Sequence, residues 1–507
     1  MTTNTQTQGP QIGIFLVAHT NVGKTTLLRT LLGKDVGEID DAPDVTQATL
    51  AYDLIVDQDL GALRLWDTPG FGDSFRLAKR LQQKHRWMAW GIREIWDRVF
   101  NRKLWRCQRL ALDLRARANV ILYPVNLQER PFEAVYVAPE LQVLAWVGKP
   151  ILVILNQSGD LHGQASKAER SIEWCSHLSN FPAVRGVANL DAHTRCWIQE
   201  LSLFNKIGQV LPEAERDGYV KLATALGKTY ADRLEESAAT IATYLMQLAS
   251  DKVELETGWS DGMKDIWDAL RKSIPWGKPK SLSPLESAIQ GLAQRYAETS
   301  KAVTDKLIVI NRLNGQAAAE IMNMANTKLV TDKPLDGGAL TVLGSVMSGV
   351  LTGLAADLLA GGLTLGTGAL VGGVLGATGG AVLAKGYNII SNKEKKVVGW
   401  STDALTEAFE KSLMLYLAVA HFGRGQGQWR PKEAPKAWSD LTHLTAHRYK
   451  EQLKPLWQGI GTNLKTASAQ TDCTQLVRHA IQDVLLDIHP DCIALHLENP
   501  EPAMQLR

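Results

Sequence analysis

Short apolar runs alternate with helical patterns between residue 11 and about residue 205. This alternation predicts an α/β domain whose sheet is mainly parallel, with helices flanking it. The expected strands are Ile12–Ala18, Ala51–Val56, Leu63–Trp66, Val120–Pro124, Ile151–Leu155 and Ala183–Val187.

The hydrophobic pattern changes after residue 205. Helical spacing dominates as far as residue 335, for example over Tyr230–Lys252 and Pro284–Arg312. The segment Gly337–Ala384 is glycine-rich and apolar, and the chain from Lys385 onward is again polar with helical spacing. We therefore expect an α/β domain at 1–205 with an insertion at 76–118, a helical domain at 206–336, an apolar helical hairpin at 337–384 and a C-terminal helical domain at 385–507.

Length and composition agree with several folded domains. The 507 residues exceed what one hydrophobic core usually supports, and the net charge of +2 excludes no class of partner. The five cysteines lack metal-ligand spacing, which indicates a reducing compartment without a disulfide framework. The polar first ten residues do not resemble a signal peptide, so we expect a cytoplasmic protein.

A phosphate-binding loop follows the first expected strand and leads into a helix. Strand, loop and helix in this order form a nest of backbone N–H groups for phosphate oxygens. Gly23 lets the backbone approach the ligand, Lys24 suits the β- and γ-phosphates, and Thr25 suits Mg²⁺. Alanine replaces the usual first glycine of this motif. The residues expected to bind nucleotide here are Ala18, His19, Thr20, Asn21, Val22, Gly23, Lys24, Thr25 and Thr26.

Two further segments suit a nucleotide and its metal ion. The third expected strand leads into Asp67, which suits a water ligand of Mg²⁺, and Gly70 follows, whose N–H suits the γ-phosphate. A polar loop between these motifs carries Thr46, and Thr49 is the alternative threonine, to complete Mg²⁺ coordination while the γ-phosphate is present. Lys24, Thr46 and Gly70, together with Asn21 below, are therefore the candidate catalytic residues, and Thr25, Thr46 and Asp67 the candidate metal ligands.

Residues 11–75 resemble the Era-like branch of the Ras-type (TRAFAC class) P-loop GTPases, through Asn-Val-Gly-Lys-Thr at 21–25 and Asp-Thr-Pro-Gly at 67–70. The whole chain is more loosely similar to bacterial GTPases with an uncharacterised helical C-terminal region and a glycine-rich segment, and distantly to bacterial dynamin-like GTPases. The resemblance implies GTP and GDP as ligands, Mg²⁺ as cofactor and hydrolysis of GTP.

Guanine recognition in this class uses an Asn-Lys-x-Asp run after a strand. Here the strand Ile151–Leu155 leads into Asn156, Gln157 and, one position late, Asp160. Glutamine replaces the lysine, so Asp160 either reaches the base through Gly159 or guanine specificity is weakened. A plain turn at the strand end is the remaining interpretation.

Hydrolysis is expected to be slow. Phe71 stands where Ras-like enzymes carry the glutamine that orients the attacking water. In potassium-stimulated Era-like GTPases, the asparagine that matches Asn21 helps to hold K⁺, which acts in place of an arginine finger. Alternatively, Asn21 caps the loop and binds no ion.

The insertion at 76–118 is basic and rich in tryptophan. Its spacing predicts one or two amphipathic helices that suit an anionic membrane surface, RNA, or packing of the tryptophans against the second domain. The basic residues are Arg76, Lys79, Arg80, Lys84, Arg86, Arg93, Arg98, Arg102, Lys103, Arg106, Arg109, Arg115 and Arg117, and the tryptophans are Trp87, Trp90, Trp96 and Trp105.

The apolar segment 337–384 is long enough for two helices of about twenty residues, the length that spans a bilayer. Glycines recur every fourth residue from Gly368 to Gly380 and would lie on one helix face, as in a glycine zipper. Asp357, the segment's single charge, argues against a permanent span, so a buried hairpin in a soluble domain remains the alternative. The charged run Asn392–Lys396 would suit an exit at a cytoplasmic face.

These patterns together predict a GTP-binding molecular switch that hydrolyses slowly and associates with the inner face of the cell membrane through 337–384. The alternatives are an Era-like RNA or ribosome assembly GTPase and a structural or pore-forming effector gated by the GTPase domain. A protein partner or self-association stays open.

Overall fold

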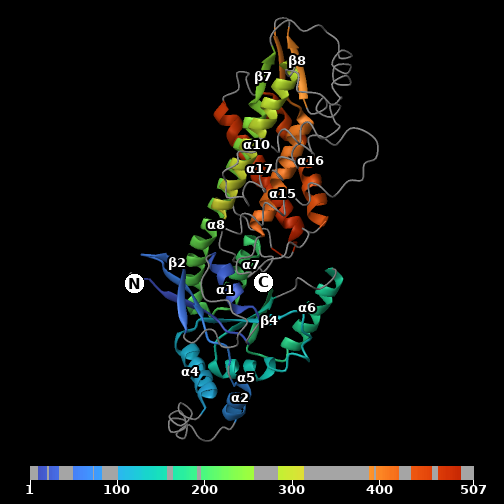
Figure 1. Cartoon of the computed structure of the whole chain (residues 1–507). Coiled ribbons are helices and arrows are strands. Elements are labelled where there is room, and N and C mark those ends of the chain that lie inside the picture. The colour runs from blue at the N-terminus through green and yellow to red at the C-terminus, as the bar shows by residue number, and fades with distance from the viewer. Residues whose placement is uncertain are drawn as a thin grey trace. The chain divides into compact units, whose positions relative to one another are not determined.

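The computed structural model describes residues 9–19, 22–33, 49–71, 73–82, 101–156, 164–190, 196–255, 284–312, 387–392, 395–421, 436–459, 466–490 and 492 (Figure 1). The chain forms two compact units. The first comprises Met1–Ala231, His421–Trp429 and Asp491–Arg507, and the second comprises Asp232–Ala420 and Arg430–Pro490.

The first unit is built on a six-stranded sheet with the strand order β2-β3-β1-β4-β5-β6. Strand β2 runs antiparallel to β3, and all other neighbouring strands are parallel. The prediction of an α/β domain with a mainly parallel sheet is therefore confirmed. The strands are β1 (Gln11–Leu16), β2 (Leu50–Asp57), β3 (Gly61–Asp67), β4 (Val120–Asn126), β5 (Ile151–Asn156) and β6 (Val184–Asn189).

The central strands are apolar because helices cover both faces of the sheet. Every residue of β5 is buried, and so is every residue of β4 except the last. Buried on both faces, such strands appear as continuous apolar runs without alternation. The helices of this unit are α1 (Lys24–Leu32), α2 (Ser74–Gln82), α4 (Arg102–Arg117), α5 (Val137–Val147), α6 (Gln164–Leu178) and α7 (Trp197–Val210).

The basic insertion contributes one face of α4 to the core of the first unit. Leu104, Leu110 and Leu114 recur on one side of this helix and are buried with the side chains of the sheet. The opposite side carries the exposed residues Arg102, Lys103, Arg106 and Arg109. Trp105 is partly buried on α4, while Trp87, Trp90 and Trp96 lie outside the described residues. The apolar part of α4 thus packs within the first unit itself.

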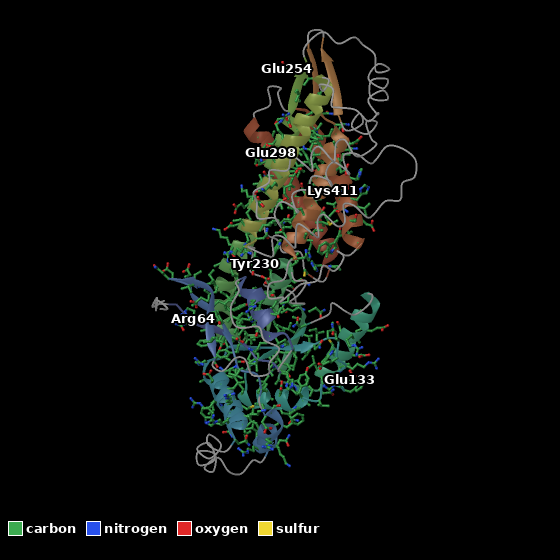
Figure 2. The ribbon with its side chains drawn as sticks, viewed as in Figure 1. Arg64, Glu133, Tyr230, Glu254, Glu298 and Lys411 are labelled. Atoms are coloured by element: carbon green, nitrogen blue, oxygen red, sulfur yellow. The ribbon has the colours of Figure 1, made fainter. Side chains whose placement is uncertain are left out.

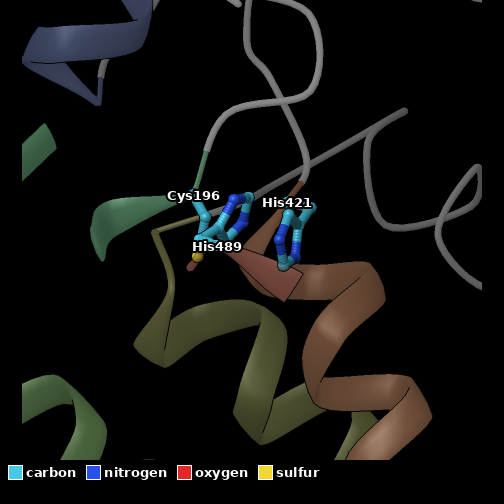
Figure 3. Close-up of side chains that lie close together, drawn as sticks. All are labelled: Cys196, His421 and His489. Carbon is cyan, nitrogen blue, oxygen red and sulfur yellow. The ribbon is translucent and has the colours of Figure 1, made fainter. Parts of the chain in front are cut away.

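Helix α8 (Glu213–Ser250) begins in the first unit, where two buried hydrogen bonds hold it against α7. The hydroxyl of Tyr219 donates to the carbonyl oxygen of Phe204 at 2.6 Å. The hydroxyl of Tyr230 donates to the buried carboxylate of Glu200 (Figure 2). At the start of α7, the side chain of Gln199 accepts a hydrogen bond from the backbone N–H of Cys196 at 2.9 Å. Figure 3 labels Cys196 together with His421, which follows α15, and His489, which follows α17.

The second unit combines helices with a small antiparallel sheet of strand order β7-β9-β8. Its core includes Tyr244 and Tyr296, and the hydroxyl of Tyr244 lies 2.9 Å from Ser300 Oγ. Burial raises the pKa of Tyr244 to about 12. The elements are the remainder of α8, β7 (Lys252–Leu255), α10 (Pro284–Ile310), β8 (Tyr387–Asn392), β9 (Lys395–Trp400), α15 (Thr402–Ala420), α16 (Lys436–Gln458) and α17 (Thr466–Ile488).

The C-terminal helical domain expected from Lys385 onward also contains two strands in its first part, which the sequence pattern did not predict. Residues 387–392 and 395–400 form two paired strands, in which Asn392 stands opposite Lys395. The described residues of the charged run, Asn392, Lys395 and Lys396, therefore lie at the ends of these strands, and β9 also pairs with β7. The physical reason is that β-branched residues such as Val397 and Val398 suit a strand that has a neighbour to pair with.

In the part of the chain that the structure describes, no helix is both long and apolar enough to cross a membrane. Residues 337–384, on which the predicted glycine-rich hairpin falls, lie outside that part.

Candidate nucleotide-binding site

The loop between β1 and α1 ends at Gly23 in a backbone conformation that suits a phosphate-binding loop. Gly23 directly precedes α1 and has a left-handed conformation with φ of 81°, which favours glycine over residues with a Cβ. Its carbonyl oxygen accepts the N–H of Leu27 at 2.9 Å, which closes the first helical turn. The free N–H groups of this helix end are a ready site for phosphate oxygens. Thr20 and Asn21 lie outside the described residues, whereas Ala18, His19, Val22, Thr25 and Thr26 lie within them.

Lys24 and Asp67 form an ion pair at the carboxyl edge of the sheet. Strands β1 and β3 are parallel neighbours, so the start of α1 and the end of β3 meet at this edge. Both side chains are almost fully buried, with exposed fractions of 11% for Lys24 and 3% for Asp67. A cation for phosphate oxygens and a carboxylate for a magnesium ligand thus stand side by side, and Thr25 follows directly on α1.

The turn after β3 is anchored to β1. Thr68 is buried, and its hydroxyl donates to the carbonyl oxygen of Leu16 at 2.8 Å. This contact places Gly70 just past the end of β3. Phe71 is only 3% exposed and packs in the hydrophobic core of the first unit. The side chain that follows Gly70 therefore points into the core and is unable to orient an attacking water.

Asn156 connects β5 to the phosphate-binding loop. It ends β5 and is fully buried, and its Nδ2 donates to the carbonyl oxygen of Val22 at 2.9 Å. One side-chain group of the predicted base-reading motif thus supports the loop that carries the lysine. Gln157, Asp160 and the switch-loop residue Thr46 lie outside the described residues.

A polar network beneath the loop was not predicted from the sequence. The Nδ1 atom of His19 lies 2.7 Å from Oε1 of Glu140, and the hydroxyl of Tyr123 donates to Oε2 of Glu140 at 2.6 Å. The ring of His19 stacks on Tyr136, with centroids 4.1 Å apart. The one available signal was Glu140 itself, the single charged residue in the mostly apolar stretch Val137–Val147.

Burial dominates the electrostatics of this network. It raises the pKa of the Glu140 carboxyl, against the hydrogen bonds from His19 and Tyr123, which lower it. Burial and the neighbouring Glu140 carboxylate hold the pKa of Tyr123 well above its ordinary value. Burial and Glu129, which accepts a hydrogen bond from Tyr136 at 3.0 Å, raise the pKa of Tyr136.

This strand order, with a phosphate-binding loop after β1 and a paired Lys24 and Asp67, defines a P-loop GTPase domain. Residues 13–157 match the family described as 50S ribosome-binding GTPase (MMR_HSR1). The chain as a whole belongs to the family described as domain of unknown function (DUF3482), which matches residues 179–486. No curated protein matches the chain, and the comparisons give no support for a likeness to dynamin-like GTPases.

Several solved structures are similar in fold to part of the chain. A variant of Aquifex aeolicus Era bound to GDP.AlF4- is 15% identical, with a TM-score of 0.29 over 58% of this chain and 89% of that one. Era in complex with MgGDPNP and a segment of 16S ribosomal RNA is 15% identical, with a TM-score of 0.29 over 60% of this chain and 89% of that one. A probable GTP-binding protein engB is 18% identical, with a TM-score of 0.24 over 39% of this chain and 97% of that one.

Proposed function

We propose that this protein is a GTP-binding switch that hydrolyses GTP slowly and associates with a membrane through its C-terminal region. The observation that supports nucleotide binding most directly is the buried pair of Lys24 and Asp67 beside the αL glycine Gly23. A triphosphate with Mg²⁺ supplies the partners that both charges need when they separate: phosphate oxygens for the ammonium group and a metal-bound water for the carboxylate.

The preference for guanine is part of this proposal. Asn156 ends β5 beside the loop, and the family matched by residues 13–157 is described as a GTPase. The test is to titrate the purified protein with GTP, GDP, ATP and ADP in parallel, in the presence of Mg²⁺. We expect tighter binding of the guanine nucleotides, and loss of that binding in Lys24→Ala. Lys79→Ala, which removes an exposed lysine from α2, is the matched control. Equal affinity for ATP and GTP would contradict guanine specificity.

Slow hydrolysis is supported by the buried Phe71, which leaves this position without a water-orienting side chain. We include K⁺, held with the help of Asn21, as a cation that would speed the reaction. Phosphate release measured in KCl and in NaCl at equal ionic strength tests this role. Faster release in KCl, lost in Asn21→Ala, is expected, and equal rates in the two salts would exclude it.

Membrane association is proposed from the sequence of 337–384, with its four-residue glycine spacing and single charge. The second candidate is an RNA or ribosome assembly role. It is supported by the exposed basic face of α4 and by the description of the matched family as ribosome-binding. Fractionation followed by a carbonate wash separates the two: retention in the membrane pellet supports insertion, and release with ribosomal material supports the RNA role.

A further inference from the structure

The histidine of the phosphate-binding loop is held by a residue 121 positions away in the sequence. Nδ1 of His19 and Oε1 of Glu140 are 2.7 Å apart, and Glu140 lies on α5 with an exposed fraction of 0%. The other carboxylate oxygen accepts a hydrogen bond from Tyr123 of β4. The imidazole ring is stacked on Tyr136, at an interplanar angle of 14°. Both the position and the plane of the His19 ring are therefore determined by α5 and β4.

A buried carboxylate at this position is unfavourable for folding. Charged groups lose hydration when they are buried, and a neutral group of the same shape is often better for stability. The titratable groups that face Glu140 are His19 from the loop, Tyr123 from β4 and Tyr136 before α5, with Glu129 beyond Tyr136. None of these neighbours requires an ionised carboxyl for packing. The carboxyl accepts a hydrogen bond from Tyr123, and its contact with His19 is the one that reaches the phosphate-binding loop.

The described parts of the loop are anchored on two sides. On the C-terminal side, Asn156 donates to the carbonyl oxygen of Val22. On the N-terminal side, Glu140 holds the His19 ring. A loop that binds phosphate through backbone N–H groups needs those groups aimed in advance, because ordering them upon binding would cost conformational entropy.

We propose that Glu140, acting through His19, is a positioning residue that holds the start of the phosphate-binding loop, at Ala18 and His19, in place for binding of a triphosphate. This role rests on the proposed binding of GTP. Glu140 belongs to none of the loop, switch or base-reading segments, so its effect on the ligand is transmitted entirely by the His19 ring.

The experiment compares full-length variants by two measurements. One is the dissociation constant of a non-hydrolysable GTP analogue, and the other is the urea midpoint of unfolding without nucleotide. In Glu140→Gln we expect about fivefold weaker binding, because an amide oxygen accepts more weakly than a carboxylate, with an unchanged or higher urea midpoint. In His19→Ala we expect binding to weaken by about tenfold.

Two further variants separate positioning from general stability. His19→Asn keeps a donor at the place of Nδ1 and should recover part of the affinity lost in His19→Ala. Tyr123→Phe removes the other hydrogen bond of the same carboxyl, leaves the loop contact in place, and should bind nearly as the unmodified protein does.

Unchanged affinity in both Glu140→Gln and His19→Ala would overturn the proposal. A loss of affinity matched by an equal loss of stability would also overturn it, since that is what a purely structural role predicts. If the unmodified protein binds no GTP analogue, the proposed function itself fails, and the positioning role fails with it.

Discussion

At the residue scale, three buried polar side chains each form a hydrogen bond to β1 or to the loop that follows it. Thr68 bonds to the last residue of β1, Asn156 to the loop carbonyl of Val22, and Glu140 to His19. Each polar group leaves water and is compensated by a contact with the segment that carries the phosphate-binding groups. The free-energy cost of burying polar groups is thus borne by side chains that hold the phosphate-binding loop in a single conformation.

The first prediction concerns the pH dependence of stability. Burial raises the pKa of Glu140 above 4.5 in the folded protein. Between 4.5 and the raised value the folded chain binds more protons than the unfolded chain, so the free energy of unfolding falls as the pH rises through that window. Glu140→Gln should remove this contribution to the pH dependence of the free energy of unfolding. The variant should therefore gain stability relative to the unmodified protein as the pH rises.

Urea unfolding without nucleotide, repeated from pH 4 to pH 8, measures this difference. Lys79→Ala leaves Glu140 and its hydrogen-bond partners in place and serves as the control. Parallel pH profiles for Glu140→Gln and the unmodified protein would contradict the prediction.

The second prediction concerns Asn156. Asn156→Ala removes the buried donor that meets the carbonyl oxygen of Val22, and we expect a loss of about 1–3 kcal/mol in the free energy of unfolding. Weaker binding of GTP should accompany it, because Val22 adjoins Gly23, which directly precedes α1. Asn180→Ala is the matched control, since the Asn180 side chain donates to the carbonyl oxygen of His177 at an exposed turn. Equal effects of the two substitutions on GTP binding would speak against this role of Asn156.

At the element scale, α4 has one buried face and one basic face. Its leucines belong to the core of the first unit, whereas Arg102, Lys103, Arg106 and Arg109 are exposed. Two interactions near its C-terminal end are internal: the guanidinium of Arg117 pairs with Asp113 and also lies 4.3 Å from the ring centroid of Trp66. Arg102, Lys103 and Arg106 are thus exposed in the first turns of α4, whereas the guanidinium of Arg115, nearer its C-terminal end, lies over the ring of Trp146.

The third prediction separates these two faces. Leu114→Ala removes a fully buried side chain and should cost about 2–5 kcal/mol of stability. Arg106→Ala changes an exposed position, and its free energy of unfolding should stay within about 0.5 kcal/mol of that of the unmodified protein. Chemical denaturation of both variants measures the contrast, and a similar loss in both would show that α4 is not divided in this way.

At the scale of the whole molecule, the two units use different kinds of sheet. The parallel sheet of the first unit brings the ends of β1, β3 and β5 to one edge, where Lys24, Asp67 and Asn156 lie. This edge is where ligands bind in open α/β sheets. The second unit carries an antiparallel sheet of three strands with helices, and its family match continues through most of that unit.

The fourth prediction is that nucleotide stabilises the first unit. A ligand present at 100 times its dissociation constant adds about 2.7 kcal/mol to the stability of the folded state that binds it. With GTP and Mg²⁺ we expect slower hydrogen exchange in β1, β3 and α1. Lys24→Ala should abolish the effect and Lys79→Ala should preserve it. Identical exchange with and without GTP in the unmodified protein would refute the prediction.

The sequence by itself determined the local features of this protein. The six strands of the first unit, the loop with Gly23 and Lys24, and the carboxylate of Asp67 are each encoded in a few neighbouring residues by apolar runs or by a short motif. The same reasoning missed β8 and β9, which are neighbours in the chain. The sheet that contains them is completed by β7, which pairs with β9 from a distant segment of the chain.

Only the tertiary structure decided which distant side chains support the loop. His19 meets Glu140 across 121 positions, and Asn156 meets Val22 across 134 positions. No local period of apolar residues encodes such contacts, because they follow from the order of the strands and from the packing of α5 against the sheet. The phosphate-binding chemistry was therefore visible in the sequence, whereas the residues that hold it in place became visible only in the fold.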